Sequence, residues 1–333
     1  MNNFSKIIDK FKNLKILVVG DLMLDQYIHG DVNRISPEAP IPILDVKRIV
    51  STPGGAANAA FNVKCLGAQV ILSGVIGPGQ RGKTLKKALE ERGIQIQGLV
   101  VDEARKTTLK ERIVAKNQQI VRVDIEDRKS IDSQTETKII EFLNSIIKDL
   151  DAIIISDYAK GMITPNLSMN IIKMARENNI LCTIDPKGKE FAKYKGCDLI
   201  TPNVEETILA LNLEKKSLKD ENKFLQAGEM LLSHVMCDNV LITQHSKGMT
   251  LFTKEGKIIK YSAVNNKVLD VSGAGDTAIA ALTLSLASNA NLKEAMAIAS
   301  HACGVVVGKS GTAATSTEEL KQSIKNIDVS SKD

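Results

Sequence analysis

Short runs of apolar, mostly β-branched residues recur along the chain, separated by longer stretches with a helical repeat. The run at 15–20 ends in glycine and has no polar alternation, which is typical of a strand buried on both faces of a parallel sheet. Similar runs occur at 70–76, 152–156, 180–184, 199–200 and 240–243. Apolar residues repeat at helical spacing at 84–92, 139–147, 167–177 and 221–232. This alternation predicts an α/β fold with a doubly wound, mostly parallel sheet.

Two stretches break the alternation. Residues 27–50, which include three prolines, and residues 107–125 have the strand-like period of two instead of a helical repeat. We expect them to form a small β lid inserted into one domain of residues 1–326. No linker or internal repeat marks a second folding unit, and the tail at 327–333 is expected to fray.

Composition narrows the functional class. The chain has 333 residues and a net charge of +5 that is not gathered into basic runs, and it has few aromatic residues and no Trp, which argues against nucleic-acid binding. Its five cysteines show no CxxC or Cys/His spacing, so neither a zinc site nor a disulfide framework is indicated. No signal-like or membrane-spanning apolar run occurs. We therefore expect a cytoplasmic protein that binds no membrane and acts on small anionic molecules.

The most informative motif is Asp-Val-Ser-Gly-Ala-Gly-Asp-Thr at 270–277, which precedes a run of small apolar residues. Gly273, Ala274 and Gly275 allow a tight turn into a helix, whose first N–H groups and positive dipole end attract an anion. An aspartate at such a site, Asp276, competes with the anion, but it makes sense as a base that deprotonates a hydroxyl beside a phosphoryl group. A Gly-rich turn without chemistry is the alternative, and the motif alone does not separate the two.

A second group of residues suits a sugar. Gly54 and Gly55 allow a ligand close to the backbone, and Asn58 offers a donor and an acceptor to a polyol, although a simple helix cap is the alternative for Asn58. Asp21 and Asp25 follow the first expected strand, where a carboxylate can accept from several hydroxyls. We favour Asp25, because Asp21 can equally well satisfy N–H groups of the turn.

A third group of polar residues is expected at a ligand-binding edge of the sheet. Asp185 and Lys187 follow an expected strand and enter the crevice at the carboxyl edge of the sheet, where α/β folds bind ligands. Asn203 and Glu206 face the same way at an expected helix start, and Glu206 could hold Mg²⁺ through water. A plain turn and a helix N-terminus with a favourable early acid are the alternatives.

One motif points to a different class of protein. Residues 77–84 match the G-x-x-x-x-G-K-[ST] pattern of P-loop NTPases, between an expected strand and an expected helix, and Asp157 could be the second acid of such a site. This interpretation leaves the motifs of the preceding three paragraphs unexplained, and a P-loop usually follows the first strand of its sheet. A P-loop NTPase that uses Gly77 to Thr84 stays an alternative.

Together the motifs resemble the ribokinase-like, or PfkB, family of carbohydrate kinases over nearly the whole chain. Residues 54–58 are similar to its N-terminal signature and residues 270–276 to its C-terminal signature. Segments at 34–42, 117–119, 156–161, 185–188 and 304–309 resemble the branch that phosphorylates D-glycero-D-manno-heptose 7-phosphate at C1 for ADP-heptose and lipopolysaccharide synthesis. The resemblance implies a Rossmann-like three-layer fold with a β lid and an ATP-dependent kinase that forms heptose 1,7-bisphosphate. Another PfkB-type sugar or sugar-phosphate kinase is the runner-up.

The resemblance also implies a role for each residue. Asp276 is the implied base, and the N–H groups of 273–276 are the implied anion hole. The implied sugar-binding positions are Asp25, Gly54, Gly55 and Asn58. The positions implied for ATP and Mg²⁺ are Lys187, Asn203, Glu206, Thr243 and Gly248. Asp270 matches a residue near a monovalent-cation site in some members, so K⁺ is a further expected ion.

The 7-phosphate needs cationic partners, for which Lys110, Arg112 and Arg122 in the second extended segment are the candidates. Because an isolated β lid leaves exposed strand edges, we expect a homodimer formed through the lid. Many heptose kinases of this type carry a fused nucleotidylyltransferase domain with an HxGH motif, and this sequence has none. We therefore expect a stand-alone kinase, with a separate nucleotidylyltransferase acting downstream.

Overall fold

The computed structural model describes residues 3–330 except 117, 215, 265–267, 310 and 312. The described part contains a main sheet with the strand order β13-β12-β11-β10-β9-β8-β1-β4-β5. Neighbouring strands from β11 to β5 are parallel, and β12 and β13 add antiparallel strands at one edge. The strands are β1 (Lys15–Gly20), β4 (Gln69–Ile76), β5 (Gln95–Val101), β8 (Ala152–Ser156), β9 (Leu181–Asp185), β10 (Leu199–Ile200), β11 (Asn239–Thr243), β12 (Met249–Thr253) and β13 (Ile258–Tyr261). The predicted α/β class with a mostly parallel sheet is confirmed.

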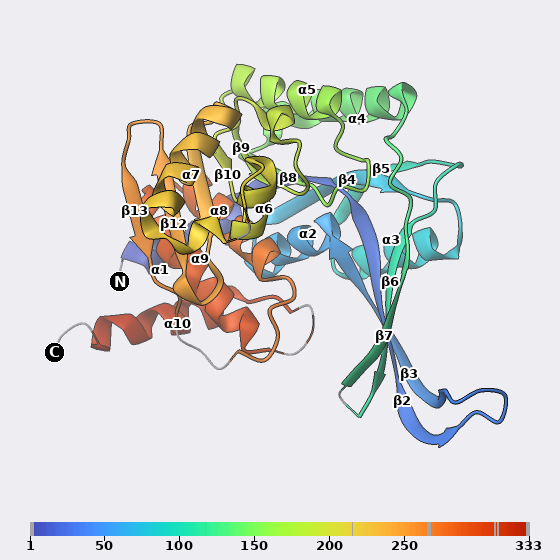
Figure 1. The fold of residues 1–333 in the computed structure, drawn as a ribbon. Helices are drawn as coiled ribbons and strands as arrows, with labels where there is room; N and C mark the ends of the chain where they lie inside the picture. Colours follow the sequence, from blue (N-terminus) through green and yellow to red (C-terminus); the bar gives the residue numbers. More distant parts are fainter. Residues whose placement is uncertain are drawn as a thin grey trace.

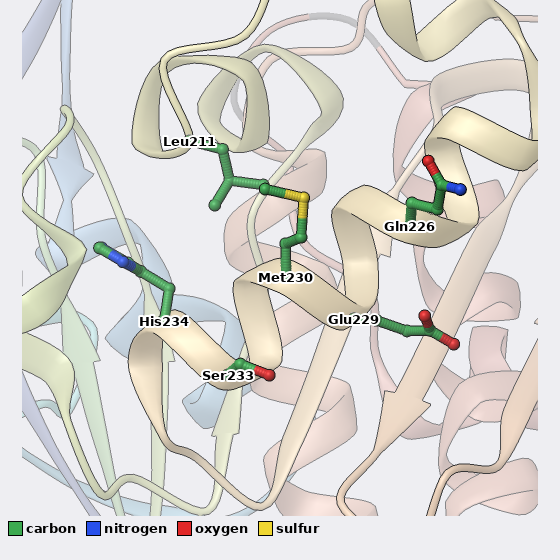
Figure 2. A pocket seen from close by; sticks show the side chains of 6 residues that line it. All are labelled: Leu211, Gln226, Glu229, Met230, Ser233 and His234. Atoms are coloured by element: carbon green, nitrogen blue, oxygen red, sulfur yellow. The ribbon is translucent and has the colours of Figure 1, made fainter.

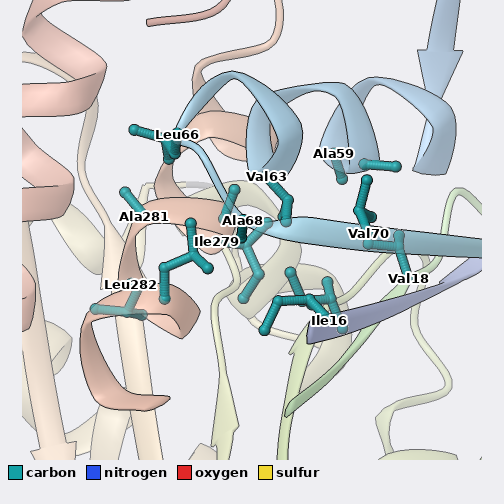
Figure 3. Packing of buried hydrophobic residues seen from close by; sticks show 14 of the residues in the cluster. Ile16, Val18, Ala59, Val63, Leu66, Ala68, Val70, Ile279, Ala281 and Leu282 are labelled. Atoms are coloured by element: carbon teal, nitrogen blue, oxygen red, sulfur yellow. The ribbon is translucent and has the colours of Figure 1, made fainter. Parts of the chain in front are cut away.

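Helices cover both faces of this sheet, so the domain has three layers (Figure 1). Ile16 and Val18 of β1 belong to a core shared with α2 and α8 (Figure 3), whereas Leu17 and Val19 belong to a second core shared with α4, α5 and α7. Burial on both faces explains why the strand is an unbroken apolar run. The helices are α1 (Asn3–Lys10), α2 (Ala56–Cys65), α3 (Gln80–Glu91), α4 (Ser133–Ile146), α5 (Pro165–Glu177), α6 (Val204–Ala210), α7 (Glu221–Val235), α8 (Ala274–Ala287), α9 (Leu292–Val307) and α10 (Thr317–Ser330).

A second, four-stranded sheet extends from the main body as a twisted ribbon (Figure 1) and is the lid. Its strands, in the order β3-β2-β6-β7, are β2 (Leu22–Ile35), β3 (Pro42–Gly55), β6 (Thr108–Ala115) and β7 (Gln118–Ile125). The β2–β3 and β6–β7 pairs are antiparallel hairpins, and the hairpins join through parallel pairing of β2 with β6. The lid strands β6 and β7 lie within the expected segment 107–125, whereas β2 and β3 extend beyond the expected segment 27–50, to Leu22 and Gly55.

The ends of the chain add little to the site. Helix α10 extends to Ser330, into the tail that we expected to fray, and residues 331–333 lie outside the described residues, as does Asn117 of the segment 117–119. In the described part of the chain, none of the helices combines the length and the apolar character needed to cross a membrane.

Candidate active site

A cavity of about 200 Å³ opens at the carboxyl ends of β8, β9 and β11. This edge is where ligands bind in open α/β sheets. The cavity brings together residues from four separate sequence motifs that we had assigned to phosphoryl transfer. They are Asp185, Lys187, Asn203, Glu206, Thr243, Gly273, Gly275 and Asp276, and the remaining lining residues are Asp157, Tyr158, Pro186, Thr201 and Ala278.

A larger hollow of about 660 Å³ lies over helix α7 and shares no lining residue with this cavity. Figure 2 shows Met230 lying toward Leu211, with Glu229 directed away from both. No group of converging charged side chains lines this hollow, so its chemistry does not suit a phosphoryl-transfer site. The smaller cavity is therefore the candidate active site.

Asp276 lies in the first turn of α8 and is buried, with 3% of its surface exposed. Its Oδ2 accepts from Asn58 Nδ2 at 2.6 Å, and its Oδ1 accepts from the Tyr158 hydroxyl at 2.8 Å. Burial raises the pKa of Asp276 to about 6, although both hydrogen bonds oppose this rise because they stabilise the charged form. The carboxylate is thus ionised at neutral pH and more basic than an ordinary aspartate, as a general base requires.

The turn before α8 has the predicted geometry. Gly273 caps the helix with a φ of 81°, a left-handed conformation that favours glycine. A Cβ on Gly275 would meet no atom within 4 Å, so there is open space at the helix start. The expected anion hole of 273–276 is only partly available, because the Ala274 N–H donates to the Val271 carbonyl at 3.2 Å. The candidate donors at the helix start are therefore the amides of Gly275 and Asp276.

Asn58 is fixed by a buried polar chain between α2 and α8. Thr277 Oγ1 donates to Asn62 Oδ1 at 2.7 Å, and Asn62 Nδ2 donates to the Asn58 carbonyl at 3.0 Å. The N-cap of α2 is Gly55, so the alternative that Asn58 is a simple helix cap is wrong. The side-chain amide of Asn58 instead orients Asp276.

Asp25 lies at the root of the lid and is 4% exposed. Arg112 Nη1 donates to its Oδ1 at 2.5 Å, and a Cβ on Gly54 would lie only 2.2 Å from its Oδ2. Gly54 is therefore required for Asp25 to occupy this position. Asp21 accepts from three backbone N–H groups, those of Tyr158, Lys160 and Met162, which agrees with its expected role in the turn.

The three predicted lid cations lie on one face with Asp25. The strand register pairs Lys110 with Asp25, and it pairs Arg112 with Arg122 across β6 and β7. Lys110 Nζ lies 5.7 Å from the centre of the Tyr158 ring, and burial lowers its pKa. Arg122 lies farther along this face, is half exposed and pairs with Asp124.

One side of the cavity, formed by the end of β9 and the start of α6, carries two carboxylates, those of Asp185 and Glu206. Asn203 and Glu206 form a capping box at the start of α6, and Lys187 Nζ donates to Glu206 Oε1 at 2.5 Å. Burial together with the charges of Glu206 and Asp276 raises the pKa of Asp185 well above its ordinary value. Glu206 thus has the expected place at the start of a helix, and it also lines the cavity. The sequence interpretation placed Asp185 in the ligand crevice but gave it no specific role.

Two carboxylates from Asp185 and Glu206 suit Mg²⁺, which proteins bind through one or two carboxylates together with phosphate oxygens. The described residues contain no group of three or more His, Cys, Asp and Glu side chains that could hold a metal ion by themselves. The donor set therefore fits a magnesium ion that enters with a nucleotide.

Of three further predicted residues, Thr243 lines the cavity, whereas Gly248 and Asp270 do not. Thr243 lines the cavity and bridges to Asn203, whereas Gly248 is absent from the lining and adopts a φ of 96° in the turn between β11 and β12. Asp270 accepts from the N–H groups of Ser272 and Gly311 at 2.9 and 3.1 Å. Its carboxylate thus joins the turn before α8 to the segment after α9, and its role beside K⁺ stays a prediction.

The string at 77–84 does not form part of this cavity. The Gly77 N–H donates to Thr107 Oγ1 at 2.9 Å, and Lys83 is exposed on α3. Asp157, the proposed second acid, accepts from the Tyr194 hydroxyl at 2.7 Å and pairs with Lys193. These contacts are structural and leave the string without a partner acid.

Comparison with known proteins gives one family. The model of the pfkB family carbohydrate kinases matches residues 13–319. The bifunctional protein HldE of Desulfatibacillum aliphaticivorans is 40% identical over 316 residues, which cover 95% of this chain and 64% of that protein. Its namesake from Helicobacter pylori (strain J99) is 42% identical over 306 residues, which cover 92% of this chain and 65% of that protein. The chain thus spans slightly less than two thirds of the length of these relatives.

Solved structures show the same fold. Phosphofructokinase-2 from Escherichia coli in complex with potassium superposes with a TM-score of 0.77 at 20% identity, covering 95% of this chain and 99% of that one. Ribokinase from Arabidopsis thaliana complexed with ribose and ATP gives a TM-score of 0.73 at 17% identity, covering 94% and 99%. The family match includes residues 77–84, so the P-loop alternative is wrong and the match to that pattern is fortuitous.

Proposed function

We propose, from the premise that this chain belongs to the pfkB family of carbohydrate kinases, that it phosphorylates the C1 hydroxyl of D-glycero-D-manno-heptose 7-phosphate. The family makes it an enzyme that transfers phosphoryl groups to small carbohydrates. The heptose specificity rests on the sequence segments that resemble that branch and on the three cations beside Asp25. The product would be heptose 1,7-bisphosphate for ADP-heptose synthesis.

The observation that carries the proposal is the buried Asp276, which lines the cavity and lies within electrostatic reach of Asp25. Its carboxylate takes the proton of the sugar hydroxyl as the oxygen attacks phosphorus, and Asn58 and Tyr158 keep it oriented during this step. The amides of Gly275 and Asp276, at the positive end of α8, stabilise the charge of the transferred group. Removal of the base is expected to lower the rate about 10²- to 10⁴-fold.

Kinase membership implies ATP and Mg²⁺, and the charged residues that line the cavity suit Mg²⁺ and the phosphates of a nucleotide. Asp185 and Glu206 would hold Mg²⁺, and Lys187 would face the phosphates. Burial lowers the pKa of Lys187, but the carboxylates of Glu206, Asp185 and Asp276 together raise it above its ordinary value, so the side chain stays a cation. When bound, Mg²⁺ supplies positive charge that offsets the negative charge of the phosphates. Thr243 lies beside this nucleotide end of the cavity.

On the sugar side, Arg112 and Lys110 would bind the 7-phosphate near Asp25, and Arg122 would reach its outer oxygens. The lid closes over the sugar and excludes water from the transfer step. Gly54 and Gly55 let the backbone pack against Asp25, Asp21 and Met23, which keeps Asp25 in position for the sugar.

The proposal includes a homodimer formed through the lid. Ile49, Ile28, Ile113 and Val121 are register neighbours across the four lid strands, and Ile49 and Val121 are 58% and 47% exposed. A second copy that covers this apolar row would bury it and protect the strand edges. Sedimentation of the chain as a monomer at micromolar concentration would contradict this part.

A coupled assay of ADP release with heptose 7-phosphate, fructose 6-phosphate, fructose 1-phosphate and ribose tests the specificity. We expect heptose 7-phosphate to have the highest kcat/KM, and Asp276→Asn to lower that turnover about 10²- to 10⁴-fold. A higher value for another acceptor would favour the alternative, a different pfkB-type sugar kinase. Absence of any transfer of adenylyl groups would support the expectation that a separate nucleotidylyltransferase acts downstream.

A further inference from the structure

Tyr158 makes three contacts that connect separate parts of the site. Its hydroxyl donates to Asp276 Oδ1 at 2.8 Å, its backbone N–H donates to Asp21 Oδ2 at 2.8 Å, and its ring lies beneath Lys110 Nζ at 5.7 Å. The residue follows β8 and lines the cavity. The hydroxyl of Tyr158 thus contacts the proposed base, and its ring contacts Lys110 of the lid.

The three contacts fix the position of the hydroxyl. Asp21 holds the backbone of the segment 158–162 through three N–H groups, and Asp157 Oδ1 accepts from the Ala159 N–H at 2.7 Å. The ring is therefore anchored at its backbone end, and the hydroxyl meets a carboxylate whose other oxygen is occupied by Asn58. Asp276 is held from two sides by groups on different elements.

We propose that Tyr158 is a positioning residue for the phosphoryl transfer assigned above, which holds the Asp276 carboxylate in place at the cavity and links it to lid residue Lys110. This inference rests on the proposed function and adds a residue to it. Tyr158 does not act as the base, because burial and the charge of Asp276 raise the pKa of its hydroxyl well above the ordinary value, so it remains a donor. Its hydroxyl stabilises the ionised form of Asp276.

The charged groups around Asp276 come from several elements. Asp25 on β2 and Asp185 on β9 disfavour its charge, whereas Lys110 on β6 favours it, and Lys187 faces it from beyond β9. Tyr158→Phe leaves all four charges and the aromatic ring in place. The variant therefore removes a single hydrogen bond to the carboxylate.

The test is the pH profile of kcat/KM for ATP-dependent phosphorylation by Tyr158→Phe, with whichever sugar acceptor the unmodified enzyme uses best. We expect the acid limb to move upward by roughly one pH unit, because a hydrogen bond to a charged group is lost. The KM for ATP should stay unchanged. Tyr158→Leu, which also removes the ring beneath Lys110, should in addition raise the KM for the sugar phosphate.

Tyr194→Phe is a matched control, since the Tyr194 hydroxyl donates to Asp157 Oδ2 at 2.7 Å and the residue is fully buried. It should lower thermal stability without moving the acid limb. An unchanged profile in Tyr158→Phe, or an equal movement in both variants, would overturn the inference.

A titration that does not use activity separates this inference from the proposed function. The pKa of Asp276 can be followed by NMR of ¹³C-labelled aspartate, with Asp276→Asn to assign the signal, and should rise in Tyr158→Phe. If the unmodified enzyme does not phosphorylate heptose 7-phosphate, the proposed function is contradicted, but the titration of Asp276 still tests the role of Tyr158. A constant pKa of Asp276 in Tyr158→Phe would contradict the role of Tyr158.

Discussion

The side-chain amide of Asn58 donates to the carboxylate of Asp276 over 2.6 Å, although the two residues are 218 positions apart in the chain. One belongs to α2 near the N-terminus and the other to α8, so the contact joins the two motifs that carry the family resemblance. The active site exists only when both helices pack on the same face of the sheet. Its chemistry can therefore be tested at single residues on either side.

Asp276→Asn should lower kcat about 10²- to 10⁴-fold while ATP binding and folding persist. An asparagine can keep both neighbours, since its oxygen accepts from Asn58 and its amide donates to Tyr158. Steady-state kinetics and isothermal calorimetry with ATP check this. Asp276→Ala is the control for packing, because it leaves two buried donors unpaired and should unfold at lower temperature. An Asp276→Asn variant with unchanged kcat would contradict the assignment of the base.

The pH dependence of activity and stability should have opposite signs. The pKa of Asp276 is raised to about 6, so kcat/KM should fall as the pH drops through that value and the base becomes protonated. The same raised pKa means that the folded state keeps a proton that the unfolded state loses near pH 4. Its stabilising contribution is therefore complete below about pH 4 and is lost as the pH rises to about 6. The Tm of Asp276→Asn relative to the unmodified enzyme should accordingly increase between pH 4 and 6.

Gly54→Ala should damage sugar binding. The added methyl group would lie 2.2 Å from Asp25 Oδ2, so the carboxylate must move. A displacement of this size lowers kcat/KM for the sugar phosphate by up to about 10²-fold, with little change in the KM for ATP. Gly79→Ala is the matched control, because a Cβ there meets nothing within 4 Å. Equal kinetics for the two variants would contradict the role of Asp25.

Arg112→Gln and Arg122→Gln should raise the KM for the sugar phosphate by different amounts. Arg112 pairs with buried Asp25, whereas Arg122 is half exposed and pairs with Asp124 on its own strand. We expect both to raise the KM for the sugar phosphate more than the KM for ATP, with the larger rise in Arg112→Gln. Measurements with a non-phosphorylated sugar are the control, since the effect of Arg122→Gln should vanish there.

Two lysines distinguish the pfkB mechanism from P-loop chemistry. Lys83→Ala should leave turnover unchanged because the side chain is exposed and outside the cavity lining. Lys187→Ala should raise the KM for ATP, since Lys187 lines the cavity beside Glu206. A loss of activity in Lys83→Ala alone would contradict this account.

The sequence predicts the central strands well because their physical situation leaves a clear pattern. Strands β1, β4, β8 and β11 are covered on both faces, so they are short apolar runs. Strand β5 lies at the edge of the sheet and is half exposed. Its sequence therefore includes polar residues and a glycine, which interrupt the apolar run that would predict a strand. Helix α9 was not predicted for the opposite reason. Most of its own residues are buried and many are small, so no polar face marks a helical repeat.

The site is predictable to the extent that its residues lie in local motifs. Asp276, Gly273 and Gly275 share one turn, and the turn geometry follows from glycine. The hydroxyl of Tyr158 meets a residue 118 positions away, and no spacing in the sequence reports such a contact. For Glu206 the sequence pattern allowed both a structural and a binding role. The structure contains the capping box and places Glu206 on the cavity, and its binding role stays a prediction.

The register of the lid strands separates two halves of the ribbon. The bulges of β2 and β3 begin after His29, and that of β6 and β7 begins after Ile113, so Asp25, Lys110 and Arg112 all lie on the regular half next to the main sheet. Bulges bend and twist a strand pair locally. The local bend and twist of the ribbon thus lie beyond Asp25, Lys110 and Arg112. Insertions or deletions in the outer half can change its length while the spacing of these charges is preserved.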